Sequence, residues 1–479
     1  MVGPRRPIRR ADYPDPVSTT IPALTDLHAR GAAQQPTYLD AAELAGVVSE
    51  LRQRPPLVFA GEADALRARI ADVAAGRAFL LQAGDCAETF GNVTAVNIRN
   101  ALRVQLSMAV ILQYASQVPV VKVGRIAGQY AKPRSSNDET RDGVTLPSYR
   151  GDAVNGLDFT EQARAHDPKR LLDVYNSSAA TLNLVRAFVN GGFADLRTVH
   201  SWNTDFVRNS RVEANFEALA DEIERAMAFM VACGVSDDAF RTVNYWASHE
   251  ALLMEYEQAL TRIDSRTGLA YGTSGHLLWI GERTRQLDGA HVELLSQLRN
   301  PIGIKLGPST TPQQARDLVE RLDPDLEPGR LTLITRMGAD KVRDVLPPLV
   351  EAVENTGRKV AWVCDPMHGN TYSTAKGYKT RAFPVIWDEV DGFFDVHAEL
   401  GTWPGGVHIE LTGNDVTECV GGVDELDEDA LADRYETACD PRLNRNQGIE
   451  LAFYLAERLK QDIARRGFNP VQDFEHQEM

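Results

Sequence analysis

The sequence predicts an α/β fold, a (β/α)8 TIM barrel with an N-terminal extension and a helical insertion. Short apolar runs typical of buried strands alternate with amphipathic stretches along the 479 residues, as parallel β-α units require. Nine such runs occur where a barrel has eight places, so one is expected either to be no strand or to lie outside the barrel. The competing layout is a doubly wound open sheet. Its nucleotide-binding versions are disfavoured, because neither G-x-G-x-x-G after an early strand nor G-x-x-x-x-G-K-[ST] is present.

The elements follow in order along the chain. Residues 1–75 mix proline-rich turns with helical patterns and are interpreted as the N-terminal extension. The strand-like runs are residues 78–84, 118–124, 196–202, 242–248, 277–282, 302–307, 331–337, 359–365 and 406–413. Between 130 and 240 the chain is longer than one β-α unit needs, which predicts a helical insertion within about 155–240. The barrel is therefore assigned to 76–460 and a C-terminal tail to 461–479.

Composition narrows the class of function. The formal net charge of −16 argues against a nucleic-acid partner, since such proteins neutralise phosphates with Lys and Arg. No apolar run follows the basic N-terminal stretch or reaches the length of a membrane span, so neither a secretory signal nor a membrane partner is expected. The five cysteines are widely and irregularly spaced, unlike a disulfide framework. A cytoplasmic location is the expectation.

Polar residues gather directly after the strand-like runs. A barrel enzyme places its chemistry at these carboxyl ends, on loops that share one face. Cys86, His368, Glu410 and Asp440 offer a thiolate, an imidazole and two carboxylates, a mixed set that suits Mn, Fe, Co or Zn. A second set is cationic, and forked guanidinium groups match phosphate and carboxylate. Its members are Arg125, Lys132, Arg134, Arg283, Lys305 and Arg336, enough for two phosphorylated ligands.

Each of these residues also has an ordinary structural interpretation. Cys86 and Cys364 could be small core residues, the commonest fate of a free cysteine. His408 lies inside an alternating strand and is expected to be a packed histidine rather than a ligand. Asp365 and Asp440 each precede a proline and could simply start turns. The gathering of cations at strand ends favours a site for several anions over scattered salt bridges.

Nine sequence blocks resemble the type II 3-deoxy-D-arabino-heptulosonate 7-phosphate (DAHP) synthases, in the same order and from about residue 20 to 460. They are LLQAGDCAETF, KVGRIAGQYAKPRS, SYRGDAVNG, WIGERTRQLDGAH, KLGPSTTP, RMGADKVRD, CDPMHGNTY, GGVHIELTGNDVTECVGG and RYETACDPRLN. The resemblance implies a (β/α)8 barrel and the condensation of phosphoenolpyruvate with D-erythrose 4-phosphate, the first step of the shikimate pathway and of aromatic amino acid biosynthesis. The products are DAHP and phosphate.

The resemblance also implies roles for individual residues. The metal ligands would be Cys86, His368, Glu410 and Asp440, with Mn²⁺ expected before Co²⁺, Zn²⁺ or Fe²⁺. Phosphoenolpyruvate would be held by Arg125, Glu282, Arg283, Lys305 and Arg336. Erythrose 4-phosphate would lie against Lys132, Pro133, Arg134, Ser135, Asp365 and Lys379. Lys305 and Glu282 are candidates for proton transfer, and Asp365 would face the aldehyde.

Cys439 adjoins the implied ligand Asp440 and should therefore lie close to Cys86. A reversible disulfide between Cys86 and Cys439 would remove a metal ligand and switch the enzyme off. The alternative is a pair that stays reduced in the cytosol.

Regulation and partners are implied only by the resemblance. Long members of the family bind aromatic amino acids through an N-terminal extension and helical insertions, and some dock a small chorismate mutase. A homodimer or homotetramer is expected. The rival function is an amino-DAHP synthase of a secondary-metabolite pathway, which would use the same metal and phosphoenolpyruvate site. A barrel hydrolase is disfavoured because no His-x-His occurs among the ten histidines. A regulatory protein on an inactive barrel is disfavoured because all the implied metal ligands and all the implied substrate-binding cations are present.

Overall fold

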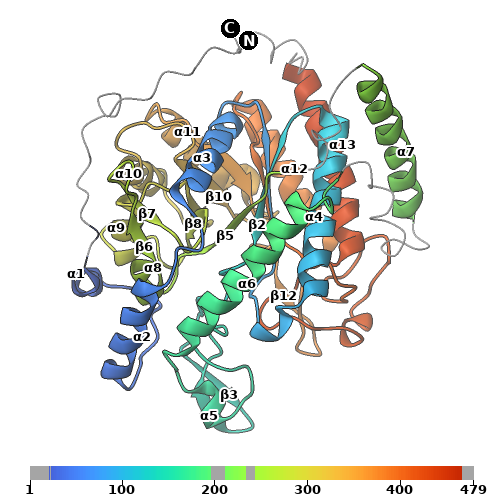
Figure 1. Ribbon diagram of the computed structural model, residues 1–479. Coiled ribbons are helices and arrows are strands. Elements are labelled where there is room, and N and C mark those ends of the chain that lie inside the picture. Colours follow the sequence, from blue (N-terminus) through green and yellow to red (C-terminus); the bar gives the residue numbers. More distant parts are fainter. Residues whose placement is uncertain (1–20, 22, 196–210, 234–242, 467–479) are drawn as a thin grey trace.

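Eight parallel strands close into a barrel in the computed structural model, which describes residues 21, 23–195, 211–233 and 243–466 (Figure 1). Around the ring the order is β1-β14-β11-β10-β9-β8-β5-β2. The strands are β1 (Phe79–Gly84), β2 (Val120–Arg125), β5 (Trp246–Glu250), β8 (Leu277–Ile280), β9 (Ile302–Leu306), β10 (Leu331–Thr335), β11 (Ala361–Cys364) and β14 (Gly406–Glu410). The ring follows chain order, as successive β-α units require. The predicted (β/α)8 barrel is confirmed.

Eight of the nine strand-like runs supply the barrel strands, and the ninth, 196–202, lies outside the described residues. The run at 242–248 was placed too early, because β5 extends to Glu250. Three short hairpins were not predicted, since they are mostly polar and contain no apolar run. They are β3 (Asp138–Arg141) with β4 (Val144–Pro147), β6 (Thr261–Ile263) with β7 (Ala270–Gly272), and β12 (Tyr372–Ser373) with β13 (Lys379–Thr380).

Helices surround the barrel and extend beyond it (Figure 1). They are α1 (Leu24–Ala29), α2 (Ala41–Gln53), α3 (Ala60–Ala74), α4 (Ala95–Ser116), α5 (Glu161–Arg164), α6 (Arg170–Asn190), α7 (Arg211–Ala232), α8 (Met254–Ala259), α9 (Ala290–Ser296), α10 (Pro312–Leu322), α11 (Val342–Glu354), α12 (Phe383–Glu399) and α13 (Arg445–Arg466). Among the described residues, no helix combines the length and apolarity that crossing a membrane requires.

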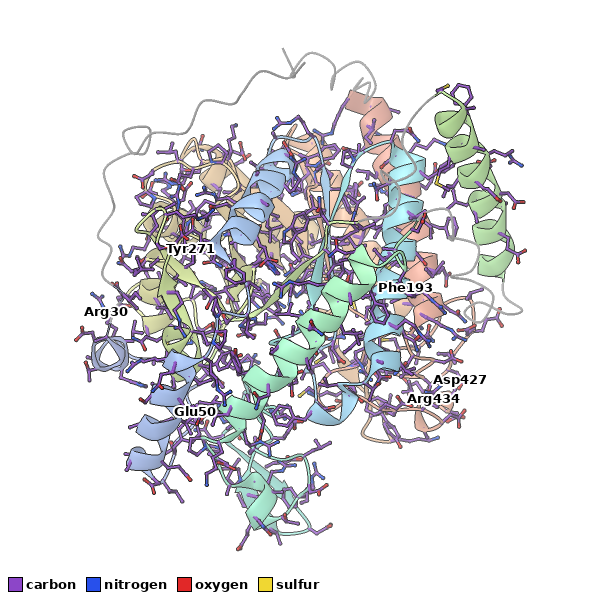
Figure 2. The ribbon with its side chains drawn as sticks, in the orientation of Figure 1. Arg30, Glu50, Phe193, Tyr271, Asp427 and Arg434 are labelled. Carbon is purple, nitrogen blue, oxygen red and sulfur yellow. The ribbon has the colours of Figure 1, made fainter. Side chains whose placement is uncertain are left out.

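The helices α6 and α7 lie where the insertion was expected, between β2 and β5, and both pack against α4. Phe193, just after α6, packs its ring 4.9 Å from that of Phe188, and the Arg103 guanidinium of α4 lies 5.9 Å from the Phe193 ring (Figure 2). The two helices therefore add an outer layer to one side of the barrel.

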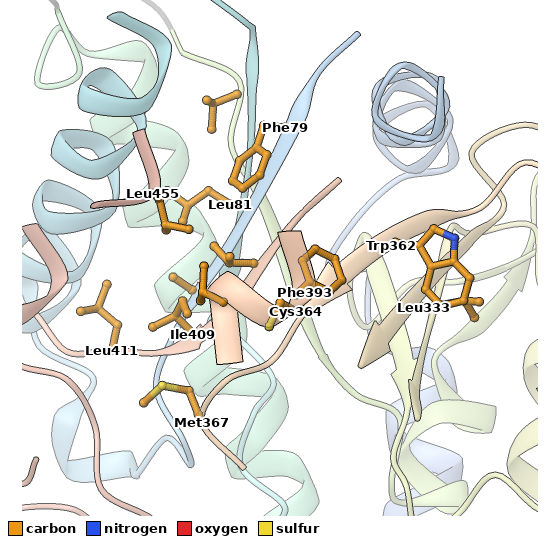
Figure 3. Packing of buried hydrophobic residues seen from close by; sticks show 14 of the residues in the cluster. Phe79, Leu81, Leu333, Trp362, Cys364, Met367, Phe393, Ile409, Leu411 and Leu455 are labelled. Atoms are coloured by element: carbon orange, nitrogen blue, oxygen red, sulfur yellow. The ribbon is translucent and has the colours of Figure 1, made fainter. Parts of the chain in front are cut away.

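Successive side chains of each strand face opposite sides of the sheet. The outward set packs against the surrounding helices, as Phe79 and Ile409 do with Phe393 of α12 and Leu455 of α13 (Figure 3). Cys364 belongs to this outward set and is fully buried, so its interpretation as a core residue is confirmed.

The inward set differs between the two ends of the barrel. At the amino end it is apolar, and α3 closes this end by packing Leu66, Ile70 and Val73 against inward residues of the strands. At the carboxyl end the inward positions at the strand termini carry charges instead, among them Arg125 on β2 and Glu410 on β14. The apolar plug fixes the strands, and the charged end is left to form a site.

Candidate functional site

A cavity of about 210 Å³ opens at the carboxyl ends of the strands. Its charged lining comprises Arg125, Lys132, Arg134, Arg283, Lys305, Arg336, Lys379, Glu250, Glu282 and Asp440. The cations outnumber the carboxylates, and a concave, cationic surface of this kind attracts anionic ligands. Pro133, Ser135 and His368 also line the cavity, and Asp365 lies next to it through contacts with Lys305 and His368. The structure thus brings the predicted site residues together.

Glu410 lies at the centre of the charged layer and has no exposed surface. Its Oε1 lies 3.1 Å from an Arg125 nitrogen and 3.0 Å from Lys132 Nζ, and its Oε2 accepts a hydrogen bond from Arg381 at 2.8 Å. Burial alone would raise the pKa of the Glu410 carboxyl, but His368, Lys132 and Arg381 hold that pKa well below its usual range. A full negative charge is therefore stabilised inside the barrel.

The donor atoms of three of the four predicted metal ligands converge, and Glu410 is one of the three. One donor atom each from Cys86, Glu410 and Asp440 lies within 4.8 Å of the others. The Lys132 ammonium lies between them, 2.9 Å from Cys86 Sγ, 3.0 Å from Glu410 Oε1 and 3.0 Å from Asp440 Oδ2. The donor atoms are thus directed at one positive centre. A thiol and two carboxylates with this convergence fit a divalent cation.

His368, the fourth predicted ligand, adjoins this group. Its Nε2 lies 3.0 Å from Glu410 Oε1 and 3.5 Å from Lys132 Nζ, so the imidazole faces the same positive centre. Its Nδ1 lies 2.8 Å from Asp365 Oδ2. A histidine that ligates a metal commonly donates its other ring N–H to a carboxylate, and Asp365 is placed for that role.

Cys86 and Cys439 are in hydrogen-bond contact. Burial raises the pKa of the Cys86 thiol well above its usual range, and the contact with Cys439 raises it further. A thiolate at Cys86 therefore needs a cation beside it, as a metal site would provide. Both cysteines are free thiols in the structure, and the disulfide between them stays a hypothesis.

On the opposite side of the cavity, Lys305 is buried with its Nζ 2.7 Å from Asp365 Oδ2. Burial lowers the pKa of the Lys305 ammonium. The pKa of Asp365 is held well below its usual range by His368 and Lys305, although burial opposes this. A buried lysine with a lowered pKa can release a proton more readily than an exposed one.

Glu282 and Arg336 each bond to a neighbouring loop of the site. Both oxygens of Glu282 contact Arg285, at 2.7 and 2.9 Å, and Oε2 also accepts the Gly307 backbone N–H at 2.7 Å. Arg336 donates to the His368 carbonyl at 2.7 Å and thereby joins two loops of the site. The Glu282 carboxylate therefore anchors the loop that carries Arg283.

His408 is packed rather than directed at the metal group, as the sequence indicated. Its Nδ1 lies 2.8 Å from Gln82 Oε1, its Nε2 contacts Arg125, and its ring meets Trp279 edge-on. Burial, followed by Lys305 and Arg125, lowers the pKa of His408 well below its usual range. The neutral His408 imidazole therefore contacts the Arg125 guanidinium and helps to hold it in place.

Several residues of the site were not predicted, and most of them lie away from the strand ends. Arg381 follows the predicted Lys379 by two residues; it binds Glu410 and also donates to Thr371 Oγ1 at 2.9 Å. Arg442 binds Glu418 and Asp85. Glu250 ends β5, two residues after the run 242–248, so the strand-end rule applies to it although it was not among the predicted residues.

Buried glutamates also brace the loops of the site. Glu389, in α12, accepts the backbone N–H groups of Met337 at 2.8 Å and Gly338 at 2.9 Å, and the Asn370 amide at 2.7 Å. It thus joins the loop of Arg336 to the loop of His368. Glu88 accepts three backbone N–H groups of residues 127–129 in the same way. A mid-helix glutamate gives no sequence signal for such a role.

The chain is similar to one family of known proteins. The model of the class-II DAHP synthetase family matches residues 23–456. A phospho-2-dehydro-3-deoxyheptonate aldolase of Streptomyces coelicolor is 64% identical over 426 residues, 89% of this chain and 95% of the relative. The AroG enzyme of that name from Mycolicibacterium smegmatis is 55% identical over 438 residues, 90% of this chain and 93% of the relative. A Francisella tularensis structure of that name is 14% identical with a TM-score of 0.44, covering 89% of this chain and 98% of its own.

Replacing the Glu389 brace should destabilise the fold. In Glu389→Ala two buried backbone N–H groups lose their acceptor, at about 1–3 kcal/mol each, so the free energy of unfolding should fall by about 3 kcal/mol. Urea unfolding measures this. Glu399→Ala, on the exposed end of the same helix, is the control and should change stability by less than about 0.5 kcal/mol. Equal effects of the two substitutions would contradict the bracing role.

Proposed function

The chain belongs to the class-II DAHP synthetase family, and we propose that the cavity at the strand ends is the active site for that family's reaction. The protein condenses phosphoenolpyruvate with D-erythrose 4-phosphate to give DAHP and phosphate, the first step of the shikimate pathway. The observation that supports this placement is the cationic cavity, which surrounds a thiol and carboxylate centre. Both relatives are named phospho-2-dehydro-3-deoxyheptonate aldolase, and nothing favours the amino-DAHP alternative.

A divalent metal would be held by Cys86, Glu410 and Asp440, with His368 as the fourth ligand. When bound, the metal supplies a Lewis acid that polarises the aldehyde carbonyl of erythrose 4-phosphate. Mn²⁺ is our first choice, with Co²⁺, Zn²⁺ or Fe²⁺ as alternatives, since the donor set does not distinguish among them. Lys132 lies on the predicted phosphate-binding stretch, so its ammonium has a second anion to pair with.

Phosphoenolpyruvate would be bound by the cations at the ends of β2, β8, β9 and β10. Arg125, Lys305 and Arg336 come from three strand ends, and Arg283 from the loop after β8 that Glu282 anchors. Two polyanions placed side by side repel each other, so this array is needed to bring the enol carbon and the aldehyde together. Lys305 is our candidate for proton transfer because burial lowers its pKa.

Erythrose 4-phosphate would lie on the other side of the metal group. Its phosphate would be bound by Lys132, Arg134 and Ser135, beside Pro133, and by Lys379. Lys379 Nζ lies 3.2 Å from Asp440 Oδ1, which places this cation next to the proposed metal ligand. Asp365 would face the aldehyde from the end of β11.

We also propose that residues 1–75 serve oligomerisation and regulation. The helix α2 projects from the barrel, and Leu39 just before it is 96% exposed, which suits contact with a second copy (Figure 1). A homodimer or homotetramer, aromatic amino acids as effectors, a chorismate mutase partner and a cytoplasmic location stay predictions from the family resemblance.

Removing the metal should abolish turnover. Dialysis against a chelator should stop both the loss of phosphoenolpyruvate and the release of phosphate, and added Mn²⁺ should restore them, because the carbonyl is no longer polarised without a cation. Asp440→Asn should lower metal affinity by about 100-fold, measured by titration calorimetry. Full activity in the presence of chelator would contradict the metal proposal.

Lys379→Ala should separate the two substrates kinetically. Loss of one charge-assisted contact should raise the KM for erythrose 4-phosphate about tenfold, while the KM for phosphoenolpyruvate stays within about twofold. Steady-state kinetics with each substrate varied in turn gives both values. Lys376→Ala is the matched control, since Lys376 lies between the strands of the same hairpin and pairs with Asp429. A rise in both KM values would contradict a role of Lys379 in binding erythrose 4-phosphate alone.

Cys439→Ser should protect the enzyme from oxidation. Because Cys439 contacts Cys86, hydrogen peroxide should inactivate the wild type by forming a disulfide that removes a metal ligand, and a thiol reductant should restore activity. Cys233→Ser, at an exposed cysteine, should be inactivated as fast as the wild type. Unchanged inactivation of Cys439→Ser would refute the redox pair.

A further inference from the structure

One buried carboxylate of the cavity has no role in the scheme above. Glu250 is the last residue of β5, is 8% exposed and lines the cavity together with Arg125, Arg283 and Lys305. Its Oε1 is buried and has no hydrogen-bond partner among the described residues, and the carboxylate forms no ion pair with any of them. A buried polar oxygen without a partner costs free energy, so its retention points to a use.

The backbone around Glu250 is shaped to hold this carboxylate. The Glu250 N–H donates to Gln129 Oε1 at 2.9 Å, which fixes the end of the strand. A Cβ added to Gly281 would lie 2.0 Å from Glu250 Oε1, so the carboxylate occupies space that only a glycine at 281 leaves. Gly281 directly precedes Glu282 and Arg283. The carboxylate is therefore built against the loop that is proposed to bind phosphoenolpyruvate.

The other carboxylates of the site already have partners. Glu282 is held by Arg285 and the Gly307 N–H, Asp365 by Lys305 and His368, and Asp440 by Lys132 and Lys379. Of the carboxylates that line the cavity in the described part of the chain, Glu250 alone keeps a buried oxygen without a partner. Such an oxygen can accept a proton or a hydrogen bond from a ligand.

The electrostatics suit proton transfer. Burial raises the pKa of the Glu250 carboxyl, and the surrounding cations Lys305, Lys132, Arg125 and Arg283 partly offset this. The net direction is upward, so the carboxylate is a stronger base than an exposed glutamate. The same cations keep it available in the ionised form.

We propose that Glu250 is the catalytic base for the water that attacks C2 of phosphoenolpyruvate, an inference that rests on the proposed function. The enol π pair forms the bond to the aldehyde carbon, and the aldehyde oxygen takes up a proton. The water oxygen bonds to C2, its O–H bond breaks, and the proton passes to Glu250 Oε1. When the C2–O bond to phosphate breaks, Glu250 returns this proton to the leaving oxygen. As that bond breaks, the electron pair of the C2 hydroxyl O–H bond forms the C2 carbonyl. Its proton goes to solvent, which also supplied the proton that the aldehyde oxygen took up.

The test compares Glu250→Gln and Glu250→Asp with the wild type, and Glu399→Gln serves as the exposed control. Glu250→Gln should lower kcat about 10²- to 10³-fold, while calorimetry shows phosphoenolpyruvate and Mn²⁺ binding within about threefold of the wild type. Wild-type kcat should fall as pH is lowered, because a protonated carboxyl accepts no proton. That acid limb should disappear in Glu250→Gln and persist, at reduced kcat, in Glu250→Asp.

Each outcome decides between the hypotheses. No turnover by the metal-loaded wild type would refute the proposed function itself. An active wild type with a Glu250→Gln variant that keeps the acid limb, or keeps more than about a third of kcat, would overturn only the role of Glu250. Loss of phosphoenolpyruvate binding in Glu250→Gln would also overturn it, because a binding role would then explain the defect. If Glu250→Gln fails to fold, Glu250→Asp decides: a kcat equal to that of the wild type would overturn the role of Glu250 as the base.

Discussion

The structure depends on one fully buried carboxylate, Glu410, held among cations inside a closed barrel. Removing a carboxylate from water costs several kcal/mol unless opposite charges replace the solvent, and here Arg125, Lys132 and Arg381 contact its two oxygens. Arg125 and Lys132 come from β2 and the loop after it, and Arg381 comes from a distant segment. The charge of Glu410 therefore fixes the positions of these two segments relative to β14. The metal group and the cationic cavity are built outward from this point.

The two ends of the barrel differ, and the apolar end stabilises the fold that holds these buried charges. The apolar amino end, closed by α3, supplies the packing that holds the strands in register. The carboxyl end can then carry charges that would destabilise an isolated sheet. Buried glutamates complete the support: Glu389 in α12 ties together two loops of the site, and Glu88, on the loop that carries Cys86, binds the loop after β2. The loops of the site are therefore bonded to one another and to α12.

Sequence patterns predicted the barrel and most of the site, for a physical reason. Strand-like runs show where strands end, and in a parallel barrel all strand ends meet on one face, so residues as distant as Cys86 and Glu410 could be grouped. The same rule applies to Glu250 at the end of β5, which was not among the predicted residues. Residues such as Arg381 and Glu389 could not be predicted, because their partners lie in other segments and only the folded chain brings them together.

Cys86, Glu410 and Asp440 are proposed to form a metal centre at the strand ends. Titration of chelator-treated protein with Co²⁺, followed by absorption spectroscopy, detects the thiolate ligand, because a thiolate bound to Co²⁺ gives a sulfur-to-metal charge-transfer band. We predict that the wild type develops this band until about one equivalent is bound, whereas Cys86→Ser binds Co²⁺ more weakly and without the band. A wild type that binds no Co²⁺, or the same band in Cys86→Ser, would refute the metal centre.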